Sequence, residues 1–484
     1  MGCERTDRRQ RAGAWLPGGR LPEVWVALAF SLLAWFPTAA QAGNNELTFI
    51  PAAEFSFETP ESVATGDFDS DGDIDIVVAN FVGSKLTILR NNGIGEFLPP
   101  VHLVTPGPYF VLVADVNLDG HLDIISANPL GASVSTFVNN GSGGFGTPFT
   151  TSVGLGPVAV TAGDINEDGI PDLAVANSQG NTVSLLGGNG DGSFAPIGSF
   201  GHTSPSDVKL ADLDLDGHLD IVTTNSLESN FSVRYGNGFG AFPVISNYFM
   251  GIDDALWSVN VSDVTGDGLL DLIFPCPNQD YVRVYERLPL AGYGPMPAIL
   301  TEDTPLRSVV GDFDSDGDDD ICVLNHGSGS VSLSMSQGEG NFSLVQTFPS
   351  QPGAEWIATP DLDLDGQKDL IVLSPINGAL TIHLNRTLPE RSFVRGDADG
   401  DGGLTISDPV RLLSLIFGVN TTPLACPDAG DADDSGTIAI GDPLLILAHL
   451  FGGGPAPAAP NACGTDPSPT DLLHPCLVAV GCTD

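Results

Sequence analysis

The sequence carries little positive charge. Lysine and arginine together number 17, against 61 aspartates and glutamates, and the formal net charge is −44. Nucleic-acid binding depends on basic side chains that neutralise phosphates. The composition therefore argues against nucleic acid as a partner.

Long apolar runs are also scarce. One run, residues 24–36, follows a group of arginines and precedes the small-residue sequence Ala40-Gln41-Ala42. At about 13 residues it is too short to cross a bilayer, and this order is typical of a cleavable signal peptide. No second segment is long enough to span a membrane. We expect residues 1–42 to be removed near Ala42 and the protein to be secreted, at the cell surface or periplasmic; an uncleaved anchor is the alternative.

Cysteine is rare over most of the chain. Cys3 lies in the expected signal peptide, and four of the other six cluster at the C-terminus as Cys426, Cys463, Cys476 and Cys482. Such a cluster in an exported protein predicts two disulfides. Cys276 and Cys322 either pair with each other or are buried thiols.

What the chain does have is one short string repeated seven times. The string is an aspartate, an oxygen-bearing residue two positions later, an acid at position 5, glycine at position 6 and aspartate at position 9. It begins at Asp67, Asp115, Asp164, Asp212, Asp263, Asp312 and Asp361, at intervals of 48 to 51 residues. A fixed period of this length predicts an array of equal structural units.

Oxygens at positions 1, 3, 5 and 9, with a main-chain carbonyl at position 7, suit a hard divalent cation, above all calcium. Position 7 is chemically varied, as a main-chain ligand allows. Asn117, Asn166 and Thr265 replace aspartate at position 3, so those loops should bind more weakly. A solvated acidic turn is the alternative for any single copy. The expected calcium ligands, position 7 included, are Asp67, Asp69, Asp71, Asp73, Asp75, Asp115, Asn117, Asp119, His121, Asp123, Asp164, Asn166, Asp168, Ile170, Asp172, Asp212, Asp214, Asp216, His218, Asp220, Asp263, Thr265, Asp267, Leu269, Asp271, Asp312, Asp314, Asp316, Asp318, Asp320, Asp361, Asp363, Asp365, Gln367 and Asp369.

Each loop is followed by a short apolar segment such as IVVAN or LAVAN, which predicts a strand rather than a helix. Asn-Gly turns further on, as at Asn140-Gly141 and Asn189-Gly190, predict a second hairpin in the same unit. Four-stranded units of about 50 residues pack radially as propeller blades. We therefore expect an all-β, seven-bladed propeller over residues 43–390, with about seven calcium ions.

The last repeat lacks a fourth strand. Residues near 47–58 match the fourth-strand region of other repeats. We expect this N-terminal segment to supply the outer strand of blade 7, which would close the ring and remove an exposed edge.

The string DFDSDGDIDIVVAN and the turn that follows it resemble the FG-GAP/VCBS repeat, the repeat of integrin α-subunit propellers, over about residues 45–390. The resemblance implies a calcium-stiffened propeller that is often extracellular and often used for adhesion or recognition.

A different duplication follows, in which residues 397–418 align with 431–452 without a gap. Each copy has a calcium-type loop, then Asp-Pro, then an apolar run of helical length, and proline is well tolerated in a first helical turn. Residues 391–455 should form a small helical domain binding one or two calcium ions, with 456–484 as a linker and cysteine-bearing tail. The expected ligands are Asp397, Asp399, Asp401, Thr405, Asp408, Asp431, Asp433, Ser435 and Asp442, while Ala439 offers no side-chain ligand.

This duplicated loop–helix pair resembles an EF-hand-like type I dockerin, which implies a cohesin-like partner. The chain departs from that family in the Asp-Pro that opens each helix, in aspartate at position 3 and in a cysteine-bearing insert at 420–429. A calcium-stabilised cap or sorting module is the alternative.

Catalytic signatures are missing. The sequence has no GxSxG, no HExxH and no phosphate-binding loop. We expect a non-catalytic module that recognises an extracellular protein or polysaccharide through the face opposite the calcium loops, where Tyr109, Phe110, Trp257 and Trp356 are the candidate contacts. These aromatics could instead be packing core. A polysaccharide lyase or hydrolase is the alternative function, which a cationic or acid–base cluster on that face would favour.

Overall fold

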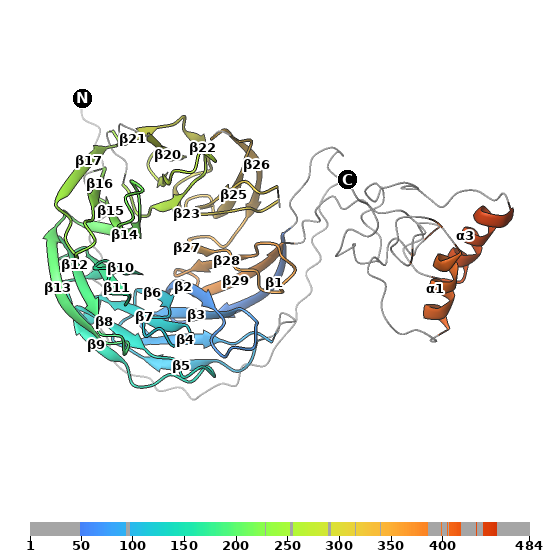
Figure 1. Ribbon diagram of the computed structural model, residues 1–484, viewed down its shortest axis with the longest axis horizontal. Coiled ribbons are helices and arrows are strands. Elements are labelled where there is room, and N and C mark those ends of the chain that lie inside the picture. Colours follow the sequence, from blue (N-terminus) through green and yellow to red (C-terminus); the bar gives the residue numbers. More distant parts are fainter. Residues whose placement is uncertain are drawn as a thin grey trace, which may run out of the picture. The chain divides into compact units, whose positions relative to one another are not determined.

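The computed structural model describes residues 49–92, 97–227, 229–251, 255–288, 292–314, 316–338 and 340–385, together with 398, 404, 406–417, 432 and 439–452. Within residues 49–385 the chain forms seven separate antiparallel sheets. Each sheet packs against the next in chain order, and the first blade packs against the last. Figure 1 shows these sheets as a ring with one strand of each nearest the centre. The predicted seven-bladed propeller is confirmed.

The first four blades run in simple order from the innermost strand outwards. Blade 1 contains β2 (Pro60–Gly66), β3 (Asp75–Asn80), β4 (Lys85–Leu89) and β5 (Val101–Val104). Blade 2 contains β6 (Phe110–Ala114), β7 (Asp123–Asn128), β8 (Ser133–Phe137) and β9 (Phe149–Ser152), with the 3-10 turn η1 (Pro129–Gly131). Blade 3 contains β10 (Pro157–Gly163), β11 (Asp172–Asn177), β12 (Thr182–Gly188) and β13 (Phe194–Gly201). Blade 4 contains β14 (Pro205–Ala211), β15 (Asp220–Asn225), β16 (Asn230–Tyr235) and β17 (Val244–Phe249).

Blade 5 departs from this order, as its sequence does. Both β21 and β22 pair with β20, so the outer strand is split in two. Blade 5 contains β18 (Asn260–Ser262), β19 (Asp271–Cys276), β20 (Tyr281–Leu288), β21 (Gly292–Pro295) and β22 (Ile299–Leu300). Blade 6 contains β23 (Pro305–Gly311), β24 (Asp320–Asn325), β25 (Ser330–Ser336) and β26 (Phe342–Pro349).

Blade 7 joins the two ends of the propeller. Its strands are β27 (Trp356–Ala358), β28 (Leu370–Ser374), β29 (Ala379–Asn385) and, outermost, β1 (Phe49–Ser56). The register runs from Phe49 opposite Asn385 to Ser56 opposite Ala379. The expectation that the N-terminal segment closes the ring is therefore confirmed.

The core lies between the flat faces of neighbouring blades. The second strands of blades 1 to 6 are buried at all six positions, because a blade face covers each side. This explains why those segments are apolar without alternation. One cluster, with Val63, Ile76 and Leu380 among its members, spans blades 7 and 1. Cys276 and Cys322 are buried thiols in separate clusters and do not form a disulfide.

Two helices follow the propeller in the chain, α1 (Ser407–Ile416) and α3 (Gly441–Gly452). They pack together around Leu412 and Ile446. Each begins one residue before its Asp-Pro pair, as the duplication predicted, and no helix in the described part of the chain is long and apolar enough to cross a membrane. The predicted signal peptide, the clustered cysteines and the loop ligands Asp397, Asp399, Asp401, Thr405, Asp431, Asp433 and Ser435 lie outside the described residues.

Candidate functional site: acidic loops and the opposite face

Every repeat of the acidic string joins the first strand of a blade to the second. Glycine at position 6 has φ between +86° and +97° in all seven loops. An added Cβ at Gly72 or Gly120 would meet nothing within 4 Å. The left-handed backbone, rather than lack of space, therefore selects glycine here.

Position 4 is also left-handed, which the sequence did not reveal. Ser70, Leu118, Glu167, Leu215 and Leu364 have φ between +56° and +61°. Their side chains share no chemistry, so no pattern marked this position. Two left-handed residues in six fold the loop tightly around a single point.

The carboxylates hold the loops through main-chain donors. In all seven loops the amide at position 6 donates to the aspartate at position 1, at 2.8–3.1 Å. The amide at position 7 donates to the acid at position 5, at 2.9–3.0 Å. In five loops the second oxygen of the position 1 aspartate also accepts a hydrogen bond, from the amide at position 5, at 3.1–3.2 Å.

Aspartate at position 9 ties the loop to the rest of its blade. In blade 1, Asp75 accepts hydrogen bonds from the amides of Phe68 at 3.0 Å and Asn91 at 2.8 Å. The same side chain is fully buried in every blade. Burial raises the pKa of Asp75 to about 7 and that of Asp220 to about 6. A cation nearby would oppose these shifts.

Three carboxylates converge in each of the four loops that have aspartate at positions 1, 3, 5 and 9. Their oxygens lie within 4.8 Å of one another, and the groups are Asp67, Asp69 and Asp71; Asp212, Asp214 and Asp220; Asp312, Asp314 and Asp316; and Asp361, Asp363 and Asp365. In blade 2, by contrast, the Asn117 amide donates to Asp119 at 2.9 Å. The four all-aspartate loops are the best candidate metal sites among the described residues.

The loops of blades 1 and 4 contain buried oxygens that lack a hydrogen-bond donor. These are Oδ1 of Asp67, Oδ1 of Asp69 and Oδ1 of Asp212. A buried carboxylate oxygen without a partner is costly, and a divalent cation at the centre of the loop would satisfy it. All the donor atoms are oxygens, which suits calcium. The residues therefore fit the predicted ion.

Neighbouring loops also touch each other. Position 4 of one blade lies against position 7 of the next: Ser70 Oγ is 3.3 Å from His121 Nδ1, and Glu167 contacts His218. Glu167 raises the pKa of His218. Position 7 was expected only to supply a carbonyl, yet in these two blades its side chain joins adjacent loops.

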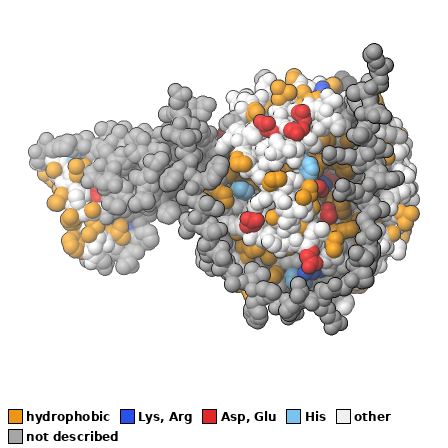
Figure 2. Space-filling view, turned by 180° about the vertical axis from the view of Figure 1, so that it is seen from behind, with side chains coloured by type: hydrophobic (Ala, Val, Ile, Leu, Met, Phe, Trp, Pro, Cys, Tyr) orange, Lys and Arg blue, Asp and Glu red, His pale blue; other side chains and the backbone are white. Residues whose placement is uncertain are grey.

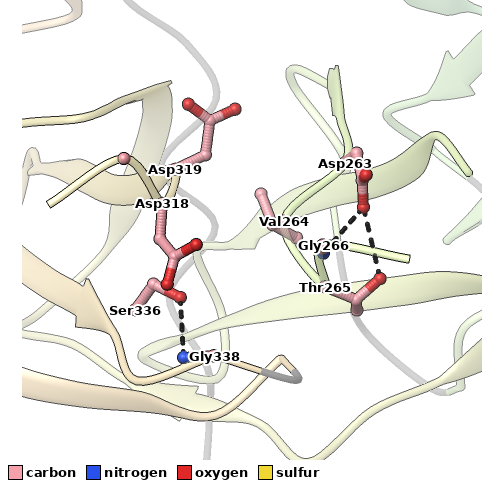
Figure 3. A pocket seen from close by; sticks show the side chains of 9 residues that line it. Asp263, Val264, Thr265, Gly266, Asp318, Asp319, Ser336 and Gly338 are labelled. Carbon is pink, nitrogen blue, oxygen red and sulfur yellow. Dashed lines mark hydrogen bonds between the residues drawn. The ribbon is translucent and has the colours of Figure 1, made fainter. Parts of the chain in front are cut away.

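Where position 4 is glycine, a cavity opens instead. A cavity of about 300 Å³ lies between the loops of blades 5 and 6. Figure 3 shows Asp318 and Asp319 on one side and Asp263 with Thr265 on the other. Gly266 has no side chain to reach Asp318, whereas Ser70 and Glu167 reach their partners in other blades.

The candidate aromatics of the opposite face have different environments. Phe110 is buried, and its ring packs edge to face with Trp356 at 5.2 Å. The Arg307 guanidinium lies 3.7 Å from the centre of the Trp356 ring. Trp257 is 45% exposed and Tyr109 is half-buried. Phe110 therefore presents no surface to a ligand, while Trp257 and Tyr109 do.

The structure gathers polar groups around these aromatics that the sequence did not single out. Arg307 Nε donates to the carbonyl of Glu355 at 3.0 Å. Burial, with the charge of Glu355, raises the pKa of Glu61 to about 7. Burial also raises the pKa of Tyr109. The sequence feature that could have identified these residues is their position relative to the loop. Glu61, Tyr109 and Glu355 each lie six residues before the first aspartate of a loop.

Figure 2 shows one face of the molecule, on which hydrophobic side chains form several separate groups and basic side chains are few. Asparagine ends the second strand in several blades, and its side chain does not add to the surface. Asn80 and Asn177 are buried, and their amides donate to Thr87 and Ser184 in the third strands. They stabilise the turn within a blade.

In the helical part, Asp408 and Asp442 are both fully buried. The Ala439 amide donates to Asp442 Oδ2 at 2.7 Å. Asp442 therefore holds the end of its loop at the start of α3.

Fold and loop geometry together define a seven-bladed propeller with an acidic loop in every blade. The FG-GAP-like repeat model matches residues 67–126, 115–175, 165–223, 212–274 and 312–372, more than half of the chain. The chain belongs to the FG-GAP-like repeat family. The loops that begin at Asp263 and Asp361 start no match of their own. The blade of Asp263 is also the one with the split outer strand.

Comparison with curated proteins finds no match. Among solved structures, a chain from the crystal structure of BBS1N in complex with ARL6DN, soaked with mercury, aligns with a TM-score of 0.52 and 14% identity. The alignment covers 70% of this chain and 98% of that one. The lead-soaked crystal gives 0.51 and 13%, with the same coverage. A lectin of Agrocybe aegerita that recognises non-reducing terminal N-acetylglucosamine aligns at 0.44 and 21%, covering 60% of this chain and 80% of that one. At these identities the similarity to the BBS1N complex concerns the fold alone.

Proposed function

We propose that this chain is an exported, calcium-binding propeller that recognises a protein or polysaccharide ligand without catalysis, on the face opposite the acidic loops. The observation that carries the proposal is the exposure of large apolar side chains on the turns of that face. Val82, Leu130, Leu155 and Ile376 are 62–72% exposed. Exposed apolar groups on the loops of a rigid scaffold are a common feature of interaction sites.

The acidic loops are proposed to hold calcium through the carboxylates of positions 1, 3, 5 and 9 and the carbonyl of position 7. Bound calcium would supply positive charge at the centre of each loop. The loop residues themselves fix the two left-handed positions and tie the first strand to the third, as Asp75 does through Phe68 and Asn91. Calcium thus stabilises the scaffold, while the opposite face remains free to bind.

An array of glycans and extracellular proteins, probed with purified protein with and without calcium, tests the proposal. We expect capture that depends on calcium and that Trp257→Ala weakens. Phe239→Ser is the matched control, because Phe239 is 86% exposed but lies in the turn between the third and fourth strands, on the side of the acidic loops. Capture that is lost in Phe239→Ser and kept in Trp257→Ala would place recognition on the wrong face.

For the C-terminal helices we propose a dockerin-like unit with a cohesin-like partner. Its support is the duplicated start of α1 and α3 at Asp-Pro and the burial of Asp408 and Asp442. A panel of cohesin modules, tested against the full chain with and without calcium, checks this. Lack of binding to every module would favour a stabilising cap instead.

Polysaccharide cleavage is a second candidate, because of one cluster. Glu61, with a pKa of about 7, lies close to Glu355 and Tyr109, and these two residues lie close to Arg307. A carboxyl group with a raised pKa can act as a general acid. Arg307 and Trp356 pack against each other beside this cluster. Release of reducing ends from a panel of polysaccharides by the wild type, abolished in Glu61→Gln, would support this alternative over recognition.

A further inference from the structure

Three consecutive blades present an aliphatic side chain at the same place. Ile376 of blade 7, Val82 of blade 1 and Leu130 of blade 2 each lie 15 residues after the first aspartate of their loop. All three lie in the turn between the second and third strands, and all are at least two-thirds exposed. At the same position, blades 3, 5 and 6 have polar or small residues, namely Gln179, Asn278 and Gly327.

The exposed aliphatic side chains at the tips of blades 2 and 7, Leu130 and Ile376, are held in place. A Cβ added to Gly107 would lie 2.5 Å from Leu130 Cδ1, and one added to Gly353 would lie 2.6 Å from Ile376 Cδ1. Each glycine belongs to the loop that precedes the first strand of the same blade. The aliphatic tip therefore rests on a glycine and keeps its outer side free. Ordered, exposed aliphatic groups give a contact surface with little entropy to lose on binding.

The same three blades carry acidic and phenolic groups nearer the centre. Glu355 of blade 7, Glu61 of blade 1 and Tyr109 of blade 2 each lie six residues before the first loop aspartate. Glu58, exposed in the turn before β2, adds another carboxylate to blade 1. We call the surface made by these residues with Ile376, Val82 and Leu130 the blade 7–1–2 sector.

Arg307 and Lys85 are described cations that lie beside this sector. Arg307 stacks on Trp356 and donates to the Glu355 carbonyl. Lys85, half-buried on β4, lies close to Gly83, as does Glu58. Among the described interactions, the charge of Glu355 acts on Arg307 and also repels the Glu61 carboxylate. An incoming cation would relieve that repulsion.

We propose that the blade 7–1–2 sector docks a protein surface that carries lysine or arginine flanked by apolar side chains. The glutamates complement the cation, and the aliphatic tips contact its apolar neighbours. Nucleic acids and anionic membranes are repelled by the same carboxylates. This inference rests on the proposed recognition function and names the class of partner.

Selection from a displayed library of random dodecapeptides tests the inference. The wild-type protein in calcium is used for selection, and the variant Glu61→Gln/Glu355→Gln/Val82→Ser/Ile376→Ser is used for counter-selection. We expect the recovered peptides to be enriched in lysine or arginine next to leucine, isoleucine or phenylalanine. Recovery of acidic or purely polar peptides, or of none that distinguish the two proteins, would overturn the proposal.

Binding of one recovered peptide then separates the contributions. Glu61→Gln/Glu355→Gln should weaken binding about tenfold and reduce its dependence on salt. Val82→Ser/Ile376→Ser should weaken binding by a similar factor without changing the dependence on salt. Leu227→Ser is the matched control, because Leu227 has the same repeat position and a similar exposure in blade 4. An equal loss in Leu227→Ser would overturn the assignment to this sector.

The array of glycans and extracellular proteins distinguishes failure of this inference from failure of the recognition function. The sector variants could capture a ligand as well as the wild type does, while Trp257→Ala no longer captures it. That result would refute this inference and preserve recognition on the same face. Failure of the wild type to capture any ligand on the array would refute the recognition function itself.

Discussion

Trp356 of blade 7 packs edge to face on Phe110 of blade 2, although blade 1 lies between those blades in the ring. The two aromatic side chains can meet only by reaching past the first strand of blade 1, near the centre of the propeller. The Arg307 guanidinium of blade 6 covers the Trp356 ring at 3.7 Å. Side chains of three blades, 6, 7 and 2, therefore meet around one indole.

This relationship predicts that Trp356→Ala is strongly destabilising. The substitution leaves a cavity between blades 6, 7 and 2 and removes the cation–π contact, so unfolding should become easier by about 3–5 kcal/mol. Thermal and denaturant unfolding in saturating calcium measure the effect. Trp257→Ala, at a residue 45% exposed, is the control and should cost far less. Equal losses in the two variants would contradict a central packing role for Trp356.

The architecture was predictable because it is written in local, repeated patterns. The period gave the number of blades, and the missing fourth strand in the last repeat predicted the pairing of β1 with β29. The fully buried second strands followed from uninterrupted apolar segments. Each of these features depends on residues close in sequence or on equivalent residues in other repeats.

The centre of the opposite face was not predictable in the same way. Residues there sit at equivalent positions but differ from blade to blade, as with Glu61, Tyr109 and Glu355. Their contacts depend on how seven first strands meet around the ring, which no local pattern records. The left-handed conformation at position 4 was hidden for another reason: apart from Gly266, the residues observed there are not glycine.

Removal of calcium should lower the stability of the propeller. Without the ion, converging carboxylates such as Asp212, Asp214 and Asp220 repel one another. Each site occupied at a hundredfold excess over its dissociation constant adds about 2.7 kcal/mol, so exhaustive EGTA treatment should lower Tm by about 10 °C or more. A stripped protein with an unchanged Tm would show that the loops hold no stabilising ion.

The positions within a loop should differ in their contribution to calcium binding. Asp67→Asn removes a charge at position 1, where Oδ1 is buried without a donor, and should reduce calcium stoichiometry by about one ion in native mass spectrometry. Asp73→Asn alters position 7 of the same loop, where only the carbonyl is expected to bind, and is the matched control. Equal stoichiometry in both variants would argue against the assignment of positions.

Deletion of residues 49–56 should open the ring. β29 would lose its outer neighbour and expose an unpaired strand edge, which favours association between chains. We expect loss of cooperative unfolding and a shift to larger species in light scattering. Should the shortened protein remain monomeric with an unchanged Tm, ring closure by β1 would contribute nothing to stability.

The raised pKa of Glu61 predicts a dependence of stability on pH. The folded pKa is about 7 and the ordinary value is 4.5, so between these pH values the folded protein binds more protons at this site than the unfolded chain. Stability due to Glu61 is therefore lost as pH rises from 4.5 to 7. Glu61→Gln cannot ionise at this site. The difference in Tm between the variant and the wild type should therefore shift by about 2 °C in favour of the variant as pH rises from 4.5 to 7, and should stay constant above pH 7. Calcium is first removed from both proteins with EGTA at pH 8 and the chelator is replaced by metal-free buffer, so that calcium binding does not vary with pH. Glu58→Gln, at an exposed glutamate nearby, should follow the wild type. Parallel curves for Glu61→Gln and wild type would mean that Glu61 is ionised in the folded protein, and the carboxylates of the blade 7–1–2 sector would then be open to solvent rather than held close together.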